Sequence, residues 1–141
     1  MTATSTNANG PRVSDMEALN RRAKQRADEA RQRADELLQR YQELADRPDA
    51  TPEQLQHARR AAVAARSNAA DACQHLLEQL DRSAAIHQLN ANAHDQAAIV
   101  ASGHADKLGH IHAAERHRAA ARRDRAKAEE LRQPPPTHEC P

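Results

Sequence analysis

The sequence predicts an all-α protein, a long antiparallel helical hairpin of coiled-coil type extended to a three-helix bundle, with flexible N- and C-terminal tails. Three observations predict this fold. A seven-residue repeat runs from Lys24 to Ala30 (KQRADEA) and again from Arg31 to Leu37 (RQRADEL). Two S/T-x-x-E/Q capping boxes mark helix starts. Ala, Glu, Lys, Leu and Arg together make up 74 of the 141 residues, which is typical of long helices.

The first helix is expected over about residues 15–46, after a capping box formed by Ser14 and Glu17. Apolar and small residues then recur at alternating steps of four and three, the spacing of a heptad seam. The seam residues are Met16, Asn20, Ala23, Ala27, Ala30, Ala34, Leu37, Tyr41 and Leu44, and the stripe is expected to be widened by Leu19, Leu38 and Ala45. Acid-before-base ion pairs are expected on the outer face, between Glu17 and Arg21, Glu29 and Arg33, Glu36 and Arg40, and Glu43 and Arg47.

The second helix is expected over about residues 52–89. Pro48 ends the first helix, and Thr51-Pro52-Glu53-Gln54 combines a capping box with proline at the first helical position. So short a connection predicts that the two helices are antiparallel neighbours. The seam continues in steps of three and four through Leu55, Ala58, Ala62, Ala65, Ala69, Ala72, Leu76 and Leu80, with Cys73 and Leu77 beside it.

The third helix is expected over about residues 93–132. Asn90, Asn92 and two glycines lower helix propensity here. The second helix therefore ends either near Asn90, which we favour, or near Ser102. One broad stripe is expected, interrupted by His104 and Arg118; its members are Ala97, Val100, Leu108, Ile111, Ala114, Ala121, Ala128 and Leu131.

The composition also bears on the tails, the compartment and the core. Residues 1–12 are small and polar and residues 134–141 are proline-rich, so both are expected to be flexible. Cys73 and Cys140 make no disulfide framework, and no apolar run is long enough to span a membrane, so we expect a cytoplasmic protein.

Only 17 residues are Leu, Ile or Val. Such a thin core favours self-association or a helical partner protein.

Six of the nine histidines lie between residues 87 and 117: His87, His94, His104, His110, His112 and His117. No two of them are three or four residues apart, the spacing that lets two imidazoles of one helix share a metal ion. Only ligands shared between helices or chains would make a metal site, so none is expected. We favour the interpretation that these histidines are solvated; the alternative is that they charge a helix interface as the pH falls.

The segment 113–133 has seven basic and four acidic residues. Its basic residues would suit phosphate contacts: Arg116, Arg118, Arg122, Arg123, Arg125 and Lys127. However, no asparagine lies among the arginines to read a base, and no leucine zipper follows. A role in binding nucleic acid without sequence specificity is therefore the alternative hypothesis.

No enzyme motif is present: the sequence has no glycine-rich phosphate loop, no H-E-x-x-H and no nucleophile elbow. We therefore expect a non-enzymatic coiled-coil protein without cofactor, small-molecule substrate or membrane contact. It is expected to act by self-association, as a homo-oligomer, or by binding a partner's helix along the Ala/Leu seam. The expected packing or partner-contact residues are Leu37, Tyr41, Leu44, Leu76, Leu77 and Leu80.

Overall fold

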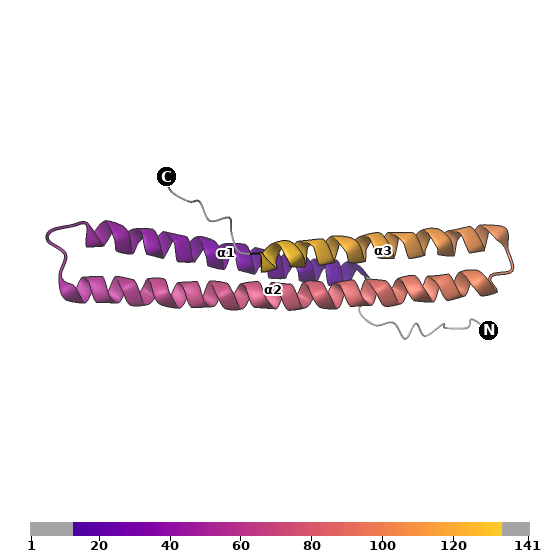
Figure 1. Cartoon of the computed structure of the whole chain (residues 1–141), viewed down its shortest axis with the longest axis horizontal. Helices are drawn as coiled ribbons and strands as arrows, with labels where there is room; N and C mark the ends of the chain where they lie inside the picture. Colours follow the sequence, from indigo (N-terminus) through magenta and orange to yellow (C-terminus); the bar gives the residue numbers. More distant parts are fainter. Residues whose placement is uncertain (1–12, 134–141) are drawn as a thin grey trace, which may run out of the picture.

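The computed structural model describes residues 13–133 and shows three helices (Figure 1). They are α1 (Val13–Ala45), α2 (Pro52–Val100) and α3 (His104–Arg132). No strand occurs in these residues, so the predicted all-α, three-helix class is confirmed. The expected flexible tails, residues 1–12 and 134–141, lie outside the described part of the chain.

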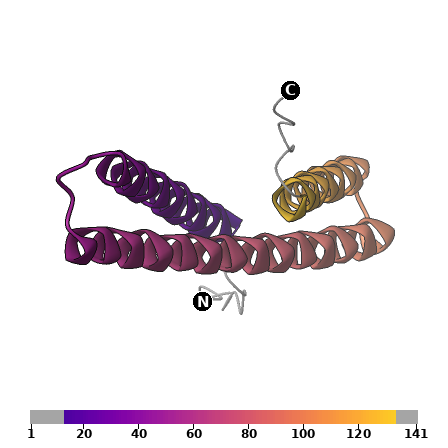
Figure 2. The same cartoon turned by 60° about the vertical axis from the view of Figure 1, so that its left-hand side comes forward.

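The long helix α2 carries both of the others. It has 49 residues, which at 1.5 Å per residue is about 74 Å. The first half of α2 packs antiparallel against α1 and the second half against α3, and both shorter helices lie on the same side of α2 (Figure 2). The start of α1 and the end of α3 both lie over the middle of α2, each packed on α2 without close backbone contact between them. We call this middle region the three-helix overlap, and the two-helix parts the α1–α2 arm (residues 30–69) and the α2–α3 arm (residues 87–117).

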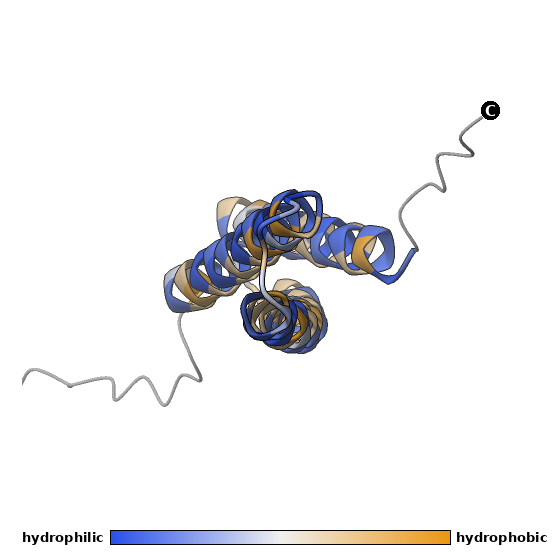
Figure 3. Ribbon diagram, turned by 90° about the vertical axis from the view of Figure 1, so that its left-hand side faces the viewer, coloured by the Kyte–Doolittle hydropathy of each residue, from blue (hydrophilic) through white to orange (hydrophobic). Residues whose placement is uncertain are grey.

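The core lies in the three-helix overlap. It takes small and large apolar residues from all three helices: Ala23, Ala27, Leu76, Leu80 and Ala128, with Ala72, Leu77 and Leu131 packed against them. Alanine lets helix axes approach to about 8 Å, the lower end of the usual range. Viewed end-on, α1 and α3 diverge above α2, and hydrophilic and hydrophobic residues alternate along each helix (Figure 3). The large buried apolar side chains, Met16, Leu76 and Leu80, all lie in the overlap, whereas the buried apolar residues of the arms are alanines.

The expected end of the second helix near Asn90 is wrong. Helix α2 continues to Val100, and the break falls at residues 101–103, before the Gly103 N-cap of α3. Asparagine lowers helix propensity by only a few tenths of a kcal/mol, and tertiary packing readily overrides such a preference. Here Ala91 is fully buried, and the Gln88 side chain donates a hydrogen bond to Asn92 at 3.2 Å.

The two predicted capping boxes have different outcomes. At α2, the Thr51 hydroxyl accepts a hydrogen bond from the Gln54 backbone N–H at 3.2 Å, and the Gln54 side chain accepts from the Thr51 backbone at 3.0 Å. That box is confirmed. The box at Ser14 is wrong, because the chain is already helical at Val13 and Ser14 lies inside the first turn. An N-cap residue needs a non-helical backbone, which Ser14 does not have.

The outer face of α1 is organised differently from the expectation. None of the four expected Glu–Arg pairs forms within residues 13–133. Instead, three of these glutamates accept from the glutamine four residues earlier: Gln25 donates to Glu29, Gln32 to Glu36 and Gln39 to Glu43, at 2.9 to 3.2 Å. An exposed ion pair gains little free energy, so few are expected to form; on α1, Lys24 pairs with Asp28 at 2.6 Å. The widening residues Leu19 and Leu38 are also exposed, at 43% and 45%, as is Ala45.

Within residues 13–133, no helix combines the length and the apolar character that a membrane span requires.

Candidate functional site

The six predicted packing or partner-contact residues lie in two separate places. Leu76 and Leu80 are buried in the three-helix overlap and Leu77 is half-buried against the same cluster. Leu37, Tyr41 and Leu44 lie near the far end of the α1–α2 arm, opposite the first turns of α2. The two groups are about 20 Å apart along α2, counting from Ala62 beside Tyr41 to Leu76. They therefore do not form one surface.

The outer group borders an open groove on the α1–α2 arm. Leu37, Tyr41 and Leu44 are each half-buried. Next to them, Leu38 and Val63 are 45% and 62% exposed. We call this surface the arm groove; it is lined by Ala34, Asp35, Leu38, Tyr41, Arg59, Ala62, Val63 and Arg66. The arm groove is thus an apolar strip with charges of both signs at its edges.

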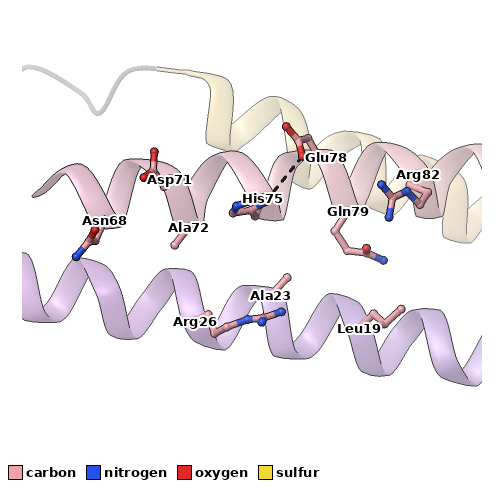
Figure 4. A pocket seen from close by; sticks show the side chains of 10 residues that line it. All are labelled: Leu19, Ala23, Arg26, Asn68, Asp71, Ala72, His75, Glu78, Gln79 and Arg82. Atoms are coloured by element: carbon pink, nitrogen blue, oxygen red, sulfur yellow. Dashed lines mark ion pairs between the residues drawn. The ribbon is translucent and has the colours of Figure 1, made fainter. Parts of the chain in front are cut away.

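A second groove runs between α1 and α2 near the three-helix overlap (Figure 4). Its apolar part is Leu19, Ala23 and Ala72, and charged and polar side chains surround it: Arg26, Asn68, Asp71, His75, Glu78, Gln79 and Arg82. The His75 ring lies 3.9 Å from the Glu78 carboxylate on the same helix. His75 is 80% exposed in its side chain, so solvent surrounds this pair. A solvated pair of this kind is not held in the water-excluding geometry that acid–base catalysis uses.

A polar network joins the three helices at the inner end of the α2–α3 arm. The Asn20 side chain of α1 donates to the Ser83 hydroxyl at 3.1 Å, and that hydroxyl donates to Asp124 of α3 at 2.6 Å. Ser83 is completely buried. The Asn20 oxygen is buried without a hydrogen-bond partner. Polar groups in a seam are costly unless paired, so this network fixes the register of all three helices.

Four histidines form the seam of the α2–α3 arm. The Nδ1 atoms of His87 and His117 are 3.1 Å apart, and those of His94 and His110 are also 3.1 Å apart. The His94 and His117 rings stack with centroids at 5.4 Å, which joins the two pairs into one row. We call this row the histidine seam. Fully buried Ala91 and Ala114 lie between the pairs along the chain.

The interpretation of the histidines as solvated side chains is therefore wrong for four of the six. His87 is only 3% exposed, and His94, His110 and His117 are half-buried; His104 and His112 are indeed exposed. The spacing of the histidines within each helix indicated this arrangement. His87 and His94 of α2 are seven residues apart, as are His110 and His117 of α3, so the two histidines of each helix occupy the same heptad position. Spacing within one helix does not show which residues of a neighbouring helix face these histidines.

Burial and neighbouring charge act on His117 in the same direction. Desolvation lowers the pKa of His117 below its ordinary value of 6.5, and the charges of His87, His94 and Arg116 lower it further. The neutral form of His117 is therefore favoured in the folded protein.

The seam does not assemble a metal site. Two imidazole nitrogens converge at each pair, and no group of three or more His, Cys, Asp or Glu side chains in residues 13–133 is placed to hold a metal ion. A structural zinc site takes four ligands.

We expect the purified protein to retain well under about 0.1 zinc per chain after dialysis, because two ligands hold zinc weakly. Elemental analysis by inductively coupled plasma mass spectrometry measures this. Retention of one zinc per chain would contradict the expectation.

The basic residues of α3 lie on two flanks rather than in one strip. At 100° per residue, Arg116, Arg123 and Lys127 fall on one flank of the seam-facing side, and Arg118, Arg122 and Arg125 on the other. Arg118 is half-buried and donates to Asp95 of α2; the other five are exposed. The positive charge is therefore divided, and the nucleic-acid role stays a prediction of the sequence.

No protein-family model, no curated protein and no solved structure matches this chain.

Proposed function

We propose that this protein is a non-enzymatic helical assembly protein that self-associates through the arm groove of its α1–α2 arm. The observation that supports this is the exposure of Leu38 and Val63 beside half-buried Tyr41, on an arm of only two helices. Two helices cannot cover each other's apolar stripes completely, whereas a second hairpin would complete a four-helix arrangement. A reducing, cytoplasmic setting fits the free thiol of Cys73.

The charges of the arm groove favour a second copy of this chain as the occupant. A two-fold interface brings the same surface of both copies together, so the surface must complement itself. The arm groove carries Asp35 on α1 and both Arg59 and Arg66 on α2. When one groove is laid antiparallel on another, the acid of each copy can face the arginines of its partner. A helix of a different protein on the same strip is the competing outcome of the test.

We expect the wild-type protein to dimerise between about 1 and about 100 µM in sedimentation equilibrium, with association lost in the double variant Leu38→Gln, Val63→Gln. Both side chains are exposed within the chain, so the variant should fold normally and its dimer dissociation constant should rise by at least about tenfold. Each removed contact supplies roughly 1 kcal/mol of apolar burial.

The matched control is Ile99→Gln, Val100→Gln, which removes two still more exposed apolar side chains from the tip of the other arm. This control should dimerise as the wild type does. Equal weakening of dimerisation by both double variants would show nonspecific hydrophobic association instead of binding through the arm groove. A wild-type protein that is monomeric at about 100 µM would contradict self-association.

A further inference from the structure

Histidine and alanine side chains pack between the helices of the α2–α3 arm, whereas alanine and leucine side chains pack between those of the α1–α2 arm. Along α2 the α3-facing seam alternates Ala84, His87, Ala91, His94 and Ala98. Helix α1 has no histidine, and the two histidines of the first half of α2, His57 and His75, are exposed. The titratable seam is therefore confined to one arm.

Each imidazole pair is compatible with this contact only while at least one of its two rings is neutral. At 3.1 Å, one Nδ1–H donates to the other Nδ1, which must carry no proton. A neutral pair or a singly protonated pair satisfies this requirement. When both rings of a pair are protonated, two N–H groups and two positive charges face each other at hydrogen-bond distance, and the contact becomes repulsive.

The surroundings offer few free negative charges to the seam. Beside the seam, the half-buried acids of α2 and α3 are Asp95, which accepts from Arg118, and Asp124, which accepts from the Ser83 hydroxyl. Glu115, two residues before His117, is exposed. Arg116 adds positive charge. One turn before His110, Asp106 and Lys107 oppose each other in charge and are exposed. From α1 the side chains at this level are buried Met16 and half-buried Asn20, and the charged Asp15 and Glu17 point to solvent.

We propose that the histidine seam makes closure of the α2–α3 arm acid-sensitive: when acid protonates both rings of a pair, His87 with His117 or His94 with His110, the two cations repel and α3 separates from the second half of α2, while the α1–α2 arm stays closed. Once separated, each ring is free to bind its own proton in water. The inference is independent of the proposed self-association, which uses the other arm.

The sign of the linkage follows from the lowered pKa of His117. A group whose folded pKa lies below its unfolded value stabilises the fold above the unfolded pKa, about 6.5, and that stability is lost as the pH falls through the folded pKa. Each imidazole that is kept neutral in the closed arm multiplies the opening constant by up to about tenfold per pH unit below 6.5.

Hydrogen exchange read by mass spectrometry tests the proposal on the wild-type protein at about pH 7.5 and about pH 5.5, with labelling times scaled to the intrinsic exchange rates. Carboxylates stay ionised at both pH values. We expect peptides from residues 104–120 to lose protection by about 10- to 100-fold at the lower pH. Peptides from residues 30–45 should change by less than about twofold. Equal changes in both arms, or no change in 104–120, would overturn the proposal.

Two double variants test whether the pH response comes from the histidine seam or from histidines outside it. His94→Gln with His110→Gln replaces one pair by groups that do not titrate, and should reduce the loss of protection at low pH by about three- to tenfold. The control is His75→Gln with His112→Gln, which removes two exposed imidazoles and should behave as the wild type. An unchanged response in the seam variant would contradict the proposal; if that variant does not fold, the wild-type measurement still decides.

Discussion

Ala27→Asp is expected to lower the melting temperature by well over about 10 °C, followed by circular dichroism at 222 nm. Ala27 is completely buried and lies in the core of the three-helix overlap beside Leu76, Leu80 and Ala128. A carboxylate at this position would be desolvated among apolar groups, at a cost of several kcal/mol. For a chain of this size each kcal/mol corresponds to roughly 3 to 5 °C.

The control for Ala27→Asp is the same substitution at Ala70, an exposed position of α2 with Arg66 one turn before it. There the new carboxylate stays in water, so the melting temperature should change by less than about 3 °C, corresponding to about 0.5 kcal/mol. Similar losses from both substitutions would mean that α1 and α2 do not pack along this seam in solution.

Leu80→Ala is expected to reduce the free energy of unfolding by about 2 to 5 kcal/mol, measured by urea denaturation. Leu80 is 4% exposed and contacts the small side chains of the overlap, which cannot rearrange to fill the space that a lost isobutyl group leaves. A loss of this size is a large fraction of the free energy of unfolding of a marginally stable protein, so the variant would be partly unfolded near 37 °C.

Leu38→Ala is the comparison for Leu80→Ala, because Leu38 is 45% exposed within the chain. It should cost less than about 1 kcal/mol at a protein concentration where the chain is monomeric. If Leu38→Ala were as destabilising as Leu80→Ala, the apolar core would extend into the α1–α2 arm, and the arm groove would not be an open surface.

Local signals in the sequence were correct at the connection between α1 and α2, although the capping box at Ser14 and the four Glu–Arg pairs of α1 were not. The turn after Pro48 and the capping box at Thr51 depend on residues at most three positions apart, and the structure contains both. Some of the heptad positions are buried, namely Met16, Ala23, Ala27, Ala62, Ala65, Ala69, Leu76 and Leu80. The later positions of α1, from Ala30 to Leu44, are only half-buried. Periodicity shows which face of a helix turns inward, because that depends only on 3.6 residues per turn.

The candidate sites were less well predicted, because they depend on distance between elements. Leu37 and Leu80 share a seam pattern, yet one lies on an open arm and the other in the core. The sequence does not show how far α3 overlaps α1 along α2. That overlap decides which parts of the seam have three helices around them and which have two.

By itself the sequence determined the helical class, the antiparallel start of the hairpin and the inward faces of the first two helices near the core, since these follow from contacts within about one turn. The stripe expected for the third helix was wrong at Val100 and Leu108, which are 81% and 39% exposed. Only the tertiary structure decided that α2 runs unbroken past Asn90 and that two histidines of α2 meet two of α3. The physical reason is that weak local preferences, a few tenths of a kcal/mol at Asn90, are overruled by burial of residues such as Ala91. Which side chain faces His87 depends on the register between helices, and the buried Asn20–Ser83–Asp124 network helps to hold that register.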